Sequence, residues 1–310
     1  YFKKSENNEN YQSSEYHGIE GCLNVRKLDF HNPVAQAYFN SVTALQYPYN
    51  DDFNGPTQEG VGFYQATMTK GARHSVASAF LRPVKGRKNL EILTSVEVEK
   101  ILISNKSAIG VSVRNTKGQF KINARKEVIL SAGSISSPAI LMRSGIGNPD
   151  VLSKIGIDII HPLPGVGENL QDHVSCTIYV KTISKVPYGF SLPLIPKLSW
   201  WVLDYFMRRN GLFASNIMEC GGFLKTDNTL DYPNIQHIFM PAFRQPPPDM
   251  LAYGHGYSLN TILLRPKSVG SIRIKSSDPS DAPIIDLNML SETDDLNNLV
   301  TGIKGSRQIL

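Results

Sequence analysis

Cysteine is scarce in this sequence, with only Cys22, Cys176 and Cys220 among 310 residues. Their odd number and wide spacing exclude a disulfide framework and a cysteine-based zinc site. Two arrangements remain open: one disulfide with one free thiol, or three buried thiols that pack as small hydrophobic side chains. None of the three has an activating neighbour in the sequence, so a thiol nucleophile has little support.

Long hydrophobic runs and clusters of one charge are also missing. The apolar stretch 198–203 is too short and too amphipathic to span a bilayer. The formal net charge is +5, but the basic residues are scattered along the chain. The adjacent pairs Lys3-Lys4 and Arg208-Arg209 are typical of a solvated surface or a helix end. We therefore expect no membrane span and no nucleic-acid partner.

Several motifs of catalysis and ligand binding are absent. The seven histidines show no H-x-x-x-H or similar spacing, so no metal site is predicted. The lack of G-x-S-x-G argues against an α/β-hydrolase. The lack of G-x-G-x-x-G, with no acidic residue about 20 positions after a glycine-rich turn, argues against a nicotinamide-dependent dehydrogenase.

The most informative stretch that is present is 127–147. Val128–Leu130 predicts a buried strand, which runs into the small residues 131–134. Ser137 as the N-cap and Pro138 as the first helical residue predict a short helix, which Gly145 ends. Small residues before a helix N-terminus let a nucleotide approach the backbone. An ordinary strand–turn–helix unit without a ligand explains the stretch about as well.

Several motifs in a fixed order make the chain similar to the glucose–methanol–choline (GMC) family of FAD-dependent oxidoreductases, with its insect glucose-dehydrogenase-like branch as the best match. The similarity spans nearly the whole chain. In chain order the motifs are Asn54-Gly55, Gly71-Ala72-Arg73-x-Ser75, Ala79-Phe80-Leu81-x-Pro83, Arg87-x-Asn89-Leu90, Gly133-Ser134-x-x-Ser137-Pro138 with Ser144-Gly145-Ile146-Gly147, Pro164-Gly165-Val166-Gly167 with Asn169-Leu170-Gln171-Asp172-His173, Arg265-Pro266-Lys267-Ser268-x-Gly270, and Asp278-Pro279.

The resemblance implies an α/β fold (α+β overall): an FAD-binding domain of the glutathione-reductase type with a β-meander, and a substrate domain on a mostly antiparallel sheet with helices. The expected parts are residues 1–85 as a lid or extension of the FAD domain, 86–171 as its central part, and 172–310 as a substrate domain that is incomplete at its C-terminus. Alternation and turn residues place the meander at Val98–Ser104, Ala108–Arg114 and Gln119–Asn123, between core strands Leu90–Leu93 and Val128–Leu130.

Periodicity and breaker residues predict the other elements. We expect helices at 32–45, at 75–81 and at 198–209, the last ended by Gly211. The stretch 177–181 is predicted as a strand, and Arg244–Asp249 as an exposed loop. Strands of one further sheet are predicted at Cys220–Leu224, Asn234–Met240, Tyr257–Leu264 and Gly270–Ile274.

The resemblance also implies site residues. Val98 matches the valine whose backbone meets the FAD adenine, and Ser131, Ala132 and Gly133 match the strand end beside the adenosine. Asn169 and His173 are given a structural role in a loop. The family's phosphate-binding fingerprint lies upstream of this sequence and its histidine base beyond Leu310, so no catalytic residue is assigned and the chain is expected to be part of a longer enzyme.

The implied activity is oxidation of a CH–OH group of a sugar or other alcohol, with hydride transfer to flavin N5 and a quinone-type acceptor or oxygen as oxidant. FAD is the expected cofactor. Secretion is expected by resemblance, and the sequon Asn105-Lys106-Ser107 is compatible with it. The alternative is a truncated, non-catalytic GMC-fold protein that serves in binding or interaction.

Overall fold

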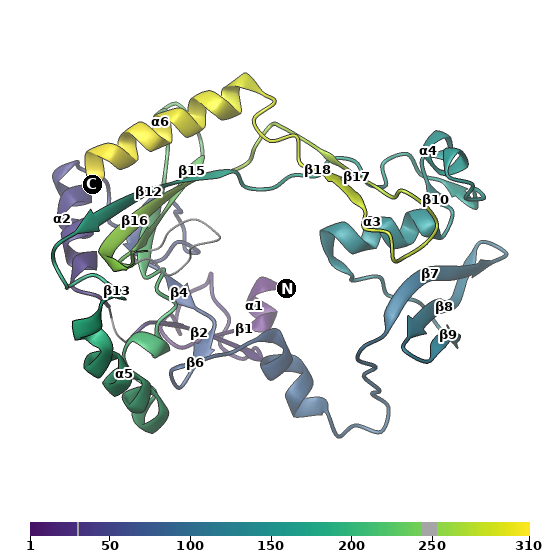
Figure 1. Ribbon diagram of the computed structural model, residues 1–310, viewed down its shortest axis with the longest axis horizontal. Coiled ribbons are helices and arrows are strands. Elements are labelled where there is room, and N and C mark those ends of the chain that lie inside the picture. Colours follow the sequence, from purple (N-terminus) through teal and green to yellow (C-terminus); the bar gives the residue numbers. More distant parts are fainter. Residues whose placement is uncertain (30, 244–252) are drawn as a thin grey trace. The chain divides into compact units, whose positions relative to one another are not determined.

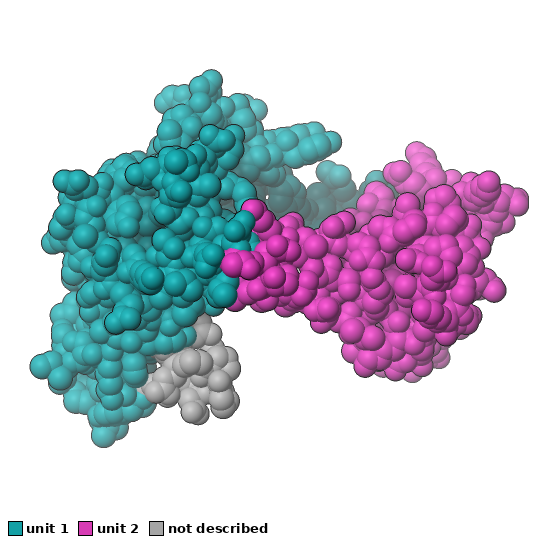
Figure 2. Space-filling model, turned by 90° about the horizontal axis from the view of Figure 1, so that it is seen from above, with its two compact units in different colours: residues 1–90, 173–265, 294–310 teal, residues 91–172, 266–293 magenta. Residues whose placement is uncertain are grey.

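The computed structural model describes residues 1–29, 31–243 and 253–310. They form two compact units, which Figure 2 colours separately. Unit 1 comprises residues 1–90, 173–265 and 294–310, and unit 2 comprises 91–172 and 266–293. The predicted exposed loop Arg244–Asp249 lies outside the described residues. The assignment of 1–85, 86–171 and 172–310 to family domains stays a prediction.

The centre of unit 1 is an antiparallel sheet with the strand order β12-β16-β15-β14-β3, and a short strand β13 also pairs with β16 (Figure 1). Three strands predicted for one sheet, near 220–224, 234–240 and 257–264, are confirmed as β14, β15 and β16, and the strand predicted at 177–181 is β12. The strands are β3 (Gly60–Phe63), β12 (Ser175–Thr182), β13 (Gly189–Phe190), β14 (Cys220–Leu224), β15 (Ile235–Met240) and β16 (Gly254–Leu263).

One prediction for this sheet is wrong. The segment predicted at 270–274 forms β17 (Ser271–Arg273), which pairs with β18 (Ile284–Asp286) in unit 2. Strand propensity is a local property, whereas the choice of partner depends on where the intervening chain leads.

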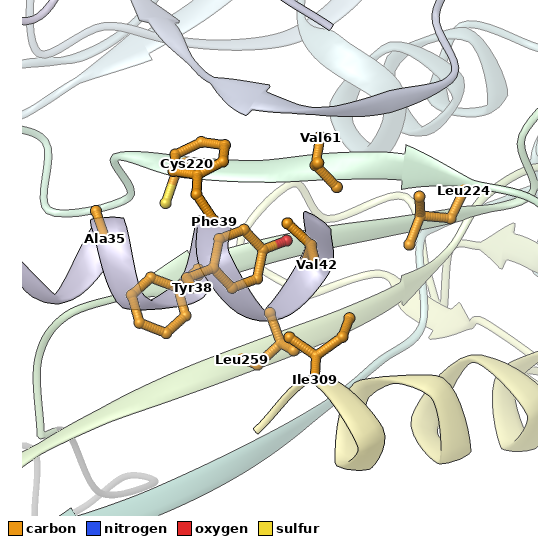
Figure 3. Packing of buried hydrophobic residues seen from close by; sticks show 10 residues of the cluster. Ala35, Tyr38, Phe39, Val42, Val61, Cys220, Leu224, Leu259 and Ile309 are labelled. Atoms are coloured by element: carbon orange, nitrogen blue, oxygen red, sulfur yellow. The ribbon is translucent and has the colours of Figure 1, made fainter. Parts of the chain in front are cut away.

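Two helices pack on one face of the sheet, α2 (Val34–Ala44) and α6 (Thr293–Ile309). Figure 3 shows side chains of α2 together with those of the strands and Ile309. Tyr38 stacks on Phe239 with ring centroids 4.8 Å apart. The predicted helix at 32–45 is confirmed as α2. The cluster comprises Ala35, Tyr38, Phe39, Val42, Val61, Cys220, Leu224, Phe239, Leu259 and Ile309.

The other elements of unit 1 are short, apart from α5 (Ile195–Arg208). The helix predicted at 75–81 is a π-helical turn, Ala77–Leu81. Gly211 is not the residue that ends α5, because Arg209 already adopts a left-handed conformation with φ 55°. The remaining elements are α1 (Phe2–Ser5), β1 (Glu6–Asn8), β2 (Leu23–Lys27), β4 (Gln65–Ala66), β5 (Met68–Thr69), β6 (Ala72–Arg73) and 3₁₀ turns at Arg82–Val84, Leu192–Leu194 and Leu212–Ala214.

Unit 2 contains the predicted meander, formed by β7 (Glu97–Ser104), β8 (Ser107–Asn115) and β9 (Gly118–Asn123). Asn105 and Lys106 have positive φ values of 47° and 63°, which close the first hairpin. In the second turn the Lys117 amide donates to the Asn115 side chain at 2.8 Å. The residues of the two turns themselves thus determine the hairpins β7–β8 and β8–β9.

The two core strands predicted on either side of the meander are absent. Residues 90–93 and 128–130 have no strand structure, and Ile129 is 77% exposed. A strand needs neighbours to pair its backbone groups, and a parallel strand needs cover on both faces. No strand among the described residues pairs with either segment, so their apolar side chains stay partly exposed.

The helix after residue 130 is α3 (Gly133–Arg143), which begins five residues before the predicted first helical residue, Pro138. Ser137 is therefore not its cap, and Pro138 lies inside the helix, where its missing N–H removes one helical bond. Gly145, with φ 77°, follows the C-cap as predicted. The core of unit 2 packs α3 against α4 (Pro149–Lys154) and β17, with the short parallel pair β10 (Ile146–Gly147) and β11 (His161–Pro162) beside them.

The three cysteines are free thiols. Cys220 is buried in the core of unit 1, Cys176 is half-buried in β12, and Cys22 is exposed. Neither arrangement left open by the sequence therefore holds: there is no disulfide, and only one thiol is buried.

Candidate functional site

The predicted nucleotide edge, Ser131–Gly133, consists of small, exposed residues at the start of α3. All three residues are exposed, and Gly133 has φ 84° with no atom within 4 Å of where a β-carbon would stand. Ala132 occupies the N-cap position and provides no side-chain acceptor. The first amides of α3 therefore lack a side-chain cap at the positive end of the helix dipole, an arrangement that favours an anionic group.

A groove of about 410 Å³ lies beside this end of α3. Its walls are one side of α3, the loop that contains the PGVG and NLQ motif residues, and one side chain of β17. The lining residues are Ser134, Pro138, Gly167, Glu168, Asn169, Leu170, Gln171 and Ile272. The groove therefore brings two motifs of the sequence, more than 25 residues apart, to one place.

Backbone hydrogen bonds fix the loop of this groove. The Ile272 amide donates to the Gly167 carbonyl at 2.7 Å, and Leu170 and Gly270 exchange bonds of 3.0 and 2.7 Å. Gly167 has φ 82°, and a β-carbon there would come within 2.3 Å of the Ile272 carbonyl oxygen. Arg273 adds an ion pair with Glu168. Asn169, with φ 55°, lies in this loop, in line with the structural role expected for it.

Val98 lies elsewhere in unit 2. It is half-buried in β7, opposite Val113 in β8, and it does not line the groove. Its strand is held at the other end of α3: Arg143 donates to the Glu99 carbonyl at 2.8 Å, and the Ile101 amide donates to Ser144 Oγ at 2.8 Å. The structure thus brings Ser131–Gly133 beside the groove and keeps Val98 apart from it. The cofactor roles of Val98, Ser131, Ala132 and Gly133 stay predictions.

Glu99, the residue after Val98, is a carboxyl buried in the meander. Burial alone raises the pKa of this carboxyl, but bonds from Ser112 and Gln119 and the Arg114 guanidinium outweigh it, so the pKa lies below its ordinary value. Ser112 Oγ donates at 2.8 Å, and Arg114 Nε lies 2.7 Å from Glu99 Oε1. Glu99 is therefore an anion at neutral pH and links β7 to β8 and β9.

A cluster in unit 1 was not predicted from the sequence. His17 is buried, with Nδ1 3.0 Å from Glu6 and Nε2 2.9 Å from Asp52. Burial lowers the pKa of the imidazole, but the two carboxylates outweigh it and raise the pKa above the ordinary value. Glu6 and Asp52 also line a cavity of about 380 Å³ with aromatic walls that include Phe53, Phe63, Tyr64 and Phe223. The three cluster residues are 11 and 35 positions apart, so no spacing signal could have revealed them.

Glu219 is a second buried carboxyl that the sequence analysis missed. Its side chain is fully buried, and burial raises its pKa, while hydrogen bonds from the Asn32 amide, Ser215 and Tyr188 oppose the rise. The Asn32 amide donates to it at 2.7 Å. It stands directly before β14, where it secures the start of α2 to the sheet.

Two further properties concern the described residues only. Within 1–29, 31–243 and 253–310, no group of three or more His, Cys, Asp or Glu side chains is arranged to hold a metal ion. The helices in these same ranges are all too short or too polar to cross a bilayer.

Two protein-family models match the sequence of this chain. The model of the N-terminal part of GMC oxidoreductases matches residues 2–175, and that of the C-terminal part matches 266–310. The chain belongs to the GMC oxidoreductase family. The family predicted from the motifs is therefore confirmed, and so is the mixed α/β fold class.

Curated relatives include an alcohol dehydrogenase [acceptor] of Pseudomonas putida, 40% identical over 99% of this GMC chain, and an oxygen-dependent choline dehydrogenase of Cronobacter sakazakii, 36% identical over all of it. The chain spans about 56% of the length of each relative. These relatives are bacterial and do not single out the insect branch.

Solved structures agree with the fold. A pyridoxine 4-oxidase from Mesorbium loti has a TM-score of 0.82 and 27% identity, covering 99% of this chain and 57% of its own. A formate oxidase has a TM-score of 0.88 at 24% identity, covering all of this chain and 59% of its own, and it supports the fold alone.

Proposed function

We propose that the GMC protein to which this chain belongs is an FAD-dependent oxidoreductase that acts on the CH–OH group of an alcohol. Family membership supports the class of reaction, and the relatives named as alcohol and choline dehydrogenases support an alcohol as substrate. The observation that carries the proposal is the exposed run of small residues Ser131–Gly133 at the N-terminus of α3, where the backbone of Gly133 faces free space.

The residues present fit FAD. A β-carbon at Gly133 would meet no atom, so a ligand has room at the backbone there, and the amides at the start of α3 favour a phosphate group nearby. Ser131, Ala132 and Gly133 would hold the adenosine side, whereas the adenine contact of the Val98 backbone is proposed from the resemblance alone, since Val98 does not line the groove beside this edge. When bound, FAD supplies the two-electron oxidation by accepting a hydride at N5, which no side chain of the protein can do. The contribution of this chain is to bind and orient.

Finer features are part of the proposal and follow from the resemblance. A sugar substrate, the insect glucose-dehydrogenase-like branch, a quinone-type acceptor or oxygen, and secretion are proposed on that basis. A choline-type alcohol is an equally suitable substrate in view of the relatives.

The test is flavin binding by the full-length protein and by the 310-residue chain. We expect visible flavin absorbance near one equivalent in the full-length protein and weak FAD retention in the chain alone. Ala132→Trp should fill the bare edge and lower FAD affinity at least about tenfold, measured by quenching of FAD fluorescence.

Ala282→Trp is the matched control, because Ala282 is also an exposed alanine of unit 2 but lies away from the groove. Equal FAD affinity of the Ala132→Trp and Ala282→Trp proteins would refute the site. A full-length protein that binds no flavin would favour the non-catalytic GMC-fold alternative.

A further inference from the structure

The helix α5 in unit 1 exposes an unusually apolar side. None of its 14 residues is buried, and Figure 1 shows it at the outer edge of that unit. Phe206, 71% exposed, marks the middle of the exposed side. At 100° per residue the exposed large side chains fall on one continuous arc of the helix. This α5 apolar face comprises Ile195, Trp200, Val202, Leu203, Phe206 and Met207.

The opposite side of α5 holds the helix on unit 1. Trp201 meets Tyr188 edge-on with ring centroids 6.0 Å apart, and Tyr205 contacts Phe213 at 6.3 Å. Because the inner side already has these partners, the α5 apolar face is not needed for the packing of the helix. The apolar face stays exposed in the folded unit. An exposed apolar patch of this kind marks a surface that binds another molecule or a membrane.

Charge around the helix is mainly positive. Residues 181–210 contain five basic residues and a single acidic one, Asp204. The Asp204 carboxylate lies 3.6 Å from the Arg208 guanidinium, which offsets it. Lys197 stands near the start of α5, and Arg208 and Arg209 stand at its end. Positive charge therefore stands at both ends of α5, and Lys197 and Arg208 lie on the side of the helix away from the apolar face.

We propose that α5 docks in the surface of an anionic lipid bilayer, with the α5 apolar face among the acyl chains and the basic residues at the lipid headgroups. An apolar arc that contains tryptophan and phenylalanine, with Lys and Arg on the opposite side and at the helix ends, is the pattern of interfacial helices. With 14 residues, α5 is about 21 Å long and lies on a bilayer rather than across it. A second copy of the chain is a less favourable partner for this face than a bilayer. A two-fold contact through the face would bring the positive charges of the two copies together.

Vesicle binding by the full-length protein tests the proposal. We expect co-sedimentation with vesicles of phosphatidylcholine and phosphatidylserine, and much weaker binding to phosphatidylcholine alone. Phe206→Ser should weaken binding on the order of tenfold through lost apolar burial. R208Q with R209Q should weaken it on the order of tenfold, and only for the anionic vesicles.

Tyr232→Ser is the matched control, since Tyr232 is an exposed aromatic residue of unit 1 outside α5, and it should leave binding unchanged. Both tryptophans of this sequence are in α5, so a protein with tryptophan only at position 200 reports insertion through quenching by brominated lipids.

Three outcomes would overturn the proposal. One is equal binding of the parent and Phe206→Ser proteins to the vesicles. Another is a dimer in solution that Phe206→Ser dissociates, because a second copy then covers the face. The third is a Trp200 that acrylamide cannot quench in the full-length protein without lipid, because the remainder of the polypeptide then covers it.

Discussion

At the scale of single residues, Gly167 shows how tightly the groove loop is specified. Its φ of 82° is unfavourable for other residues, and an added β-carbon would collide with the Ile272 carbonyl. We expect Gly167→Ala to lower the free energy of unfolding by about 1–3 kcal/mol, measured by urea denaturation. Gly165→Ala, two residues away with no atom near its β-carbon, should change it by less than about 1 kcal/mol. Equal losses would show that the loop is not held as described.

A second residue, His237, makes unit 1 sensitive to acid. Burial lowers its pKa from 6.5 to about 4, and its Nε2 lies 3.0 Å from Ser306 Oγ of α6. Between these two pH values the unfolded chain takes up a proton at His237 while the folded chain does not. Stability should therefore fall as the pH drops from 6.5 to 4, by up to roughly 3 kcal/mol.

The check is the thermal unfolding midpoint across this pH range for the parent protein and for His237→Gln. The glutamine does not titrate, so its midpoint should fall less over the same interval. Parallel curves for the two proteins would contradict a neutral, buried His237.

At the scale of elements, the meander depends on the anion Glu99. Because its pKa lies below the ordinary value, Glu99 stabilises unit 2 above about pH 4.5, and this contribution is lost as the pH falls through the lowered pKa. We expect Glu99→Gln to cost about 1–3 kcal/mol at pH 7 and to remove this part of the acid dependence, measured by chemical denaturation at several pH values.

Glu97→Gln is the control on the same strand, since the Glu97 side chain is exposed. It should cost less than about 1 kcal/mol. If both substitutions lowered the free energy of unfolding equally, the contacts of Glu99 with Ser112, Gln119 and Arg114 would not explain the stability that Glu99 contributes.

The helices and strands also differ in how well they can be predicted from the sequence. The meander and α2 follow from alternation, helical spacing and turn residues, and both were predicted. The helix α6 was not, because its buried side carries Gly302 and Ser306 among few large apolar residues, so hydrophobic spacing gives little signal. The strand at 128–130 was predicted from apolar content alone, and no described strand pairs with it.

At the scale of the whole molecule, two stretches without helix or strand should be open to protease. Residues 85–96 and 124–132 have neither, and Lys85, Arg87 and Lys88 in the first and Arg125 and Lys126 in the second are exposed. Among the described residues, we expect brief trypsin digestion of the full-length protein without FAD to cut first in these two stretches, identified by mass spectrometry.

Saturating FAD should protect the second stretch, because it leads directly into Ser131–Gly133, and should leave the first stretch open. Protection of neither stretch would contradict the proposed cofactor edge, and equal protection of both would point to a general stabilisation instead.

The sequence by itself determined the family, the hairpins of the meander, the helix α2 and the small residues at 131–133. All of these depend on local propensity, on turn chemistry or on motifs whose residues are close in the chain. Only the tertiary structure decided that Gly167 and Ile272 share one groove, that β17 joins unit 2, and that His17 lies between Glu6 and Asp52. Contacts of this kind join residues far apart in the chain, and local preference carries no information about which distant partner the folded chain brings near.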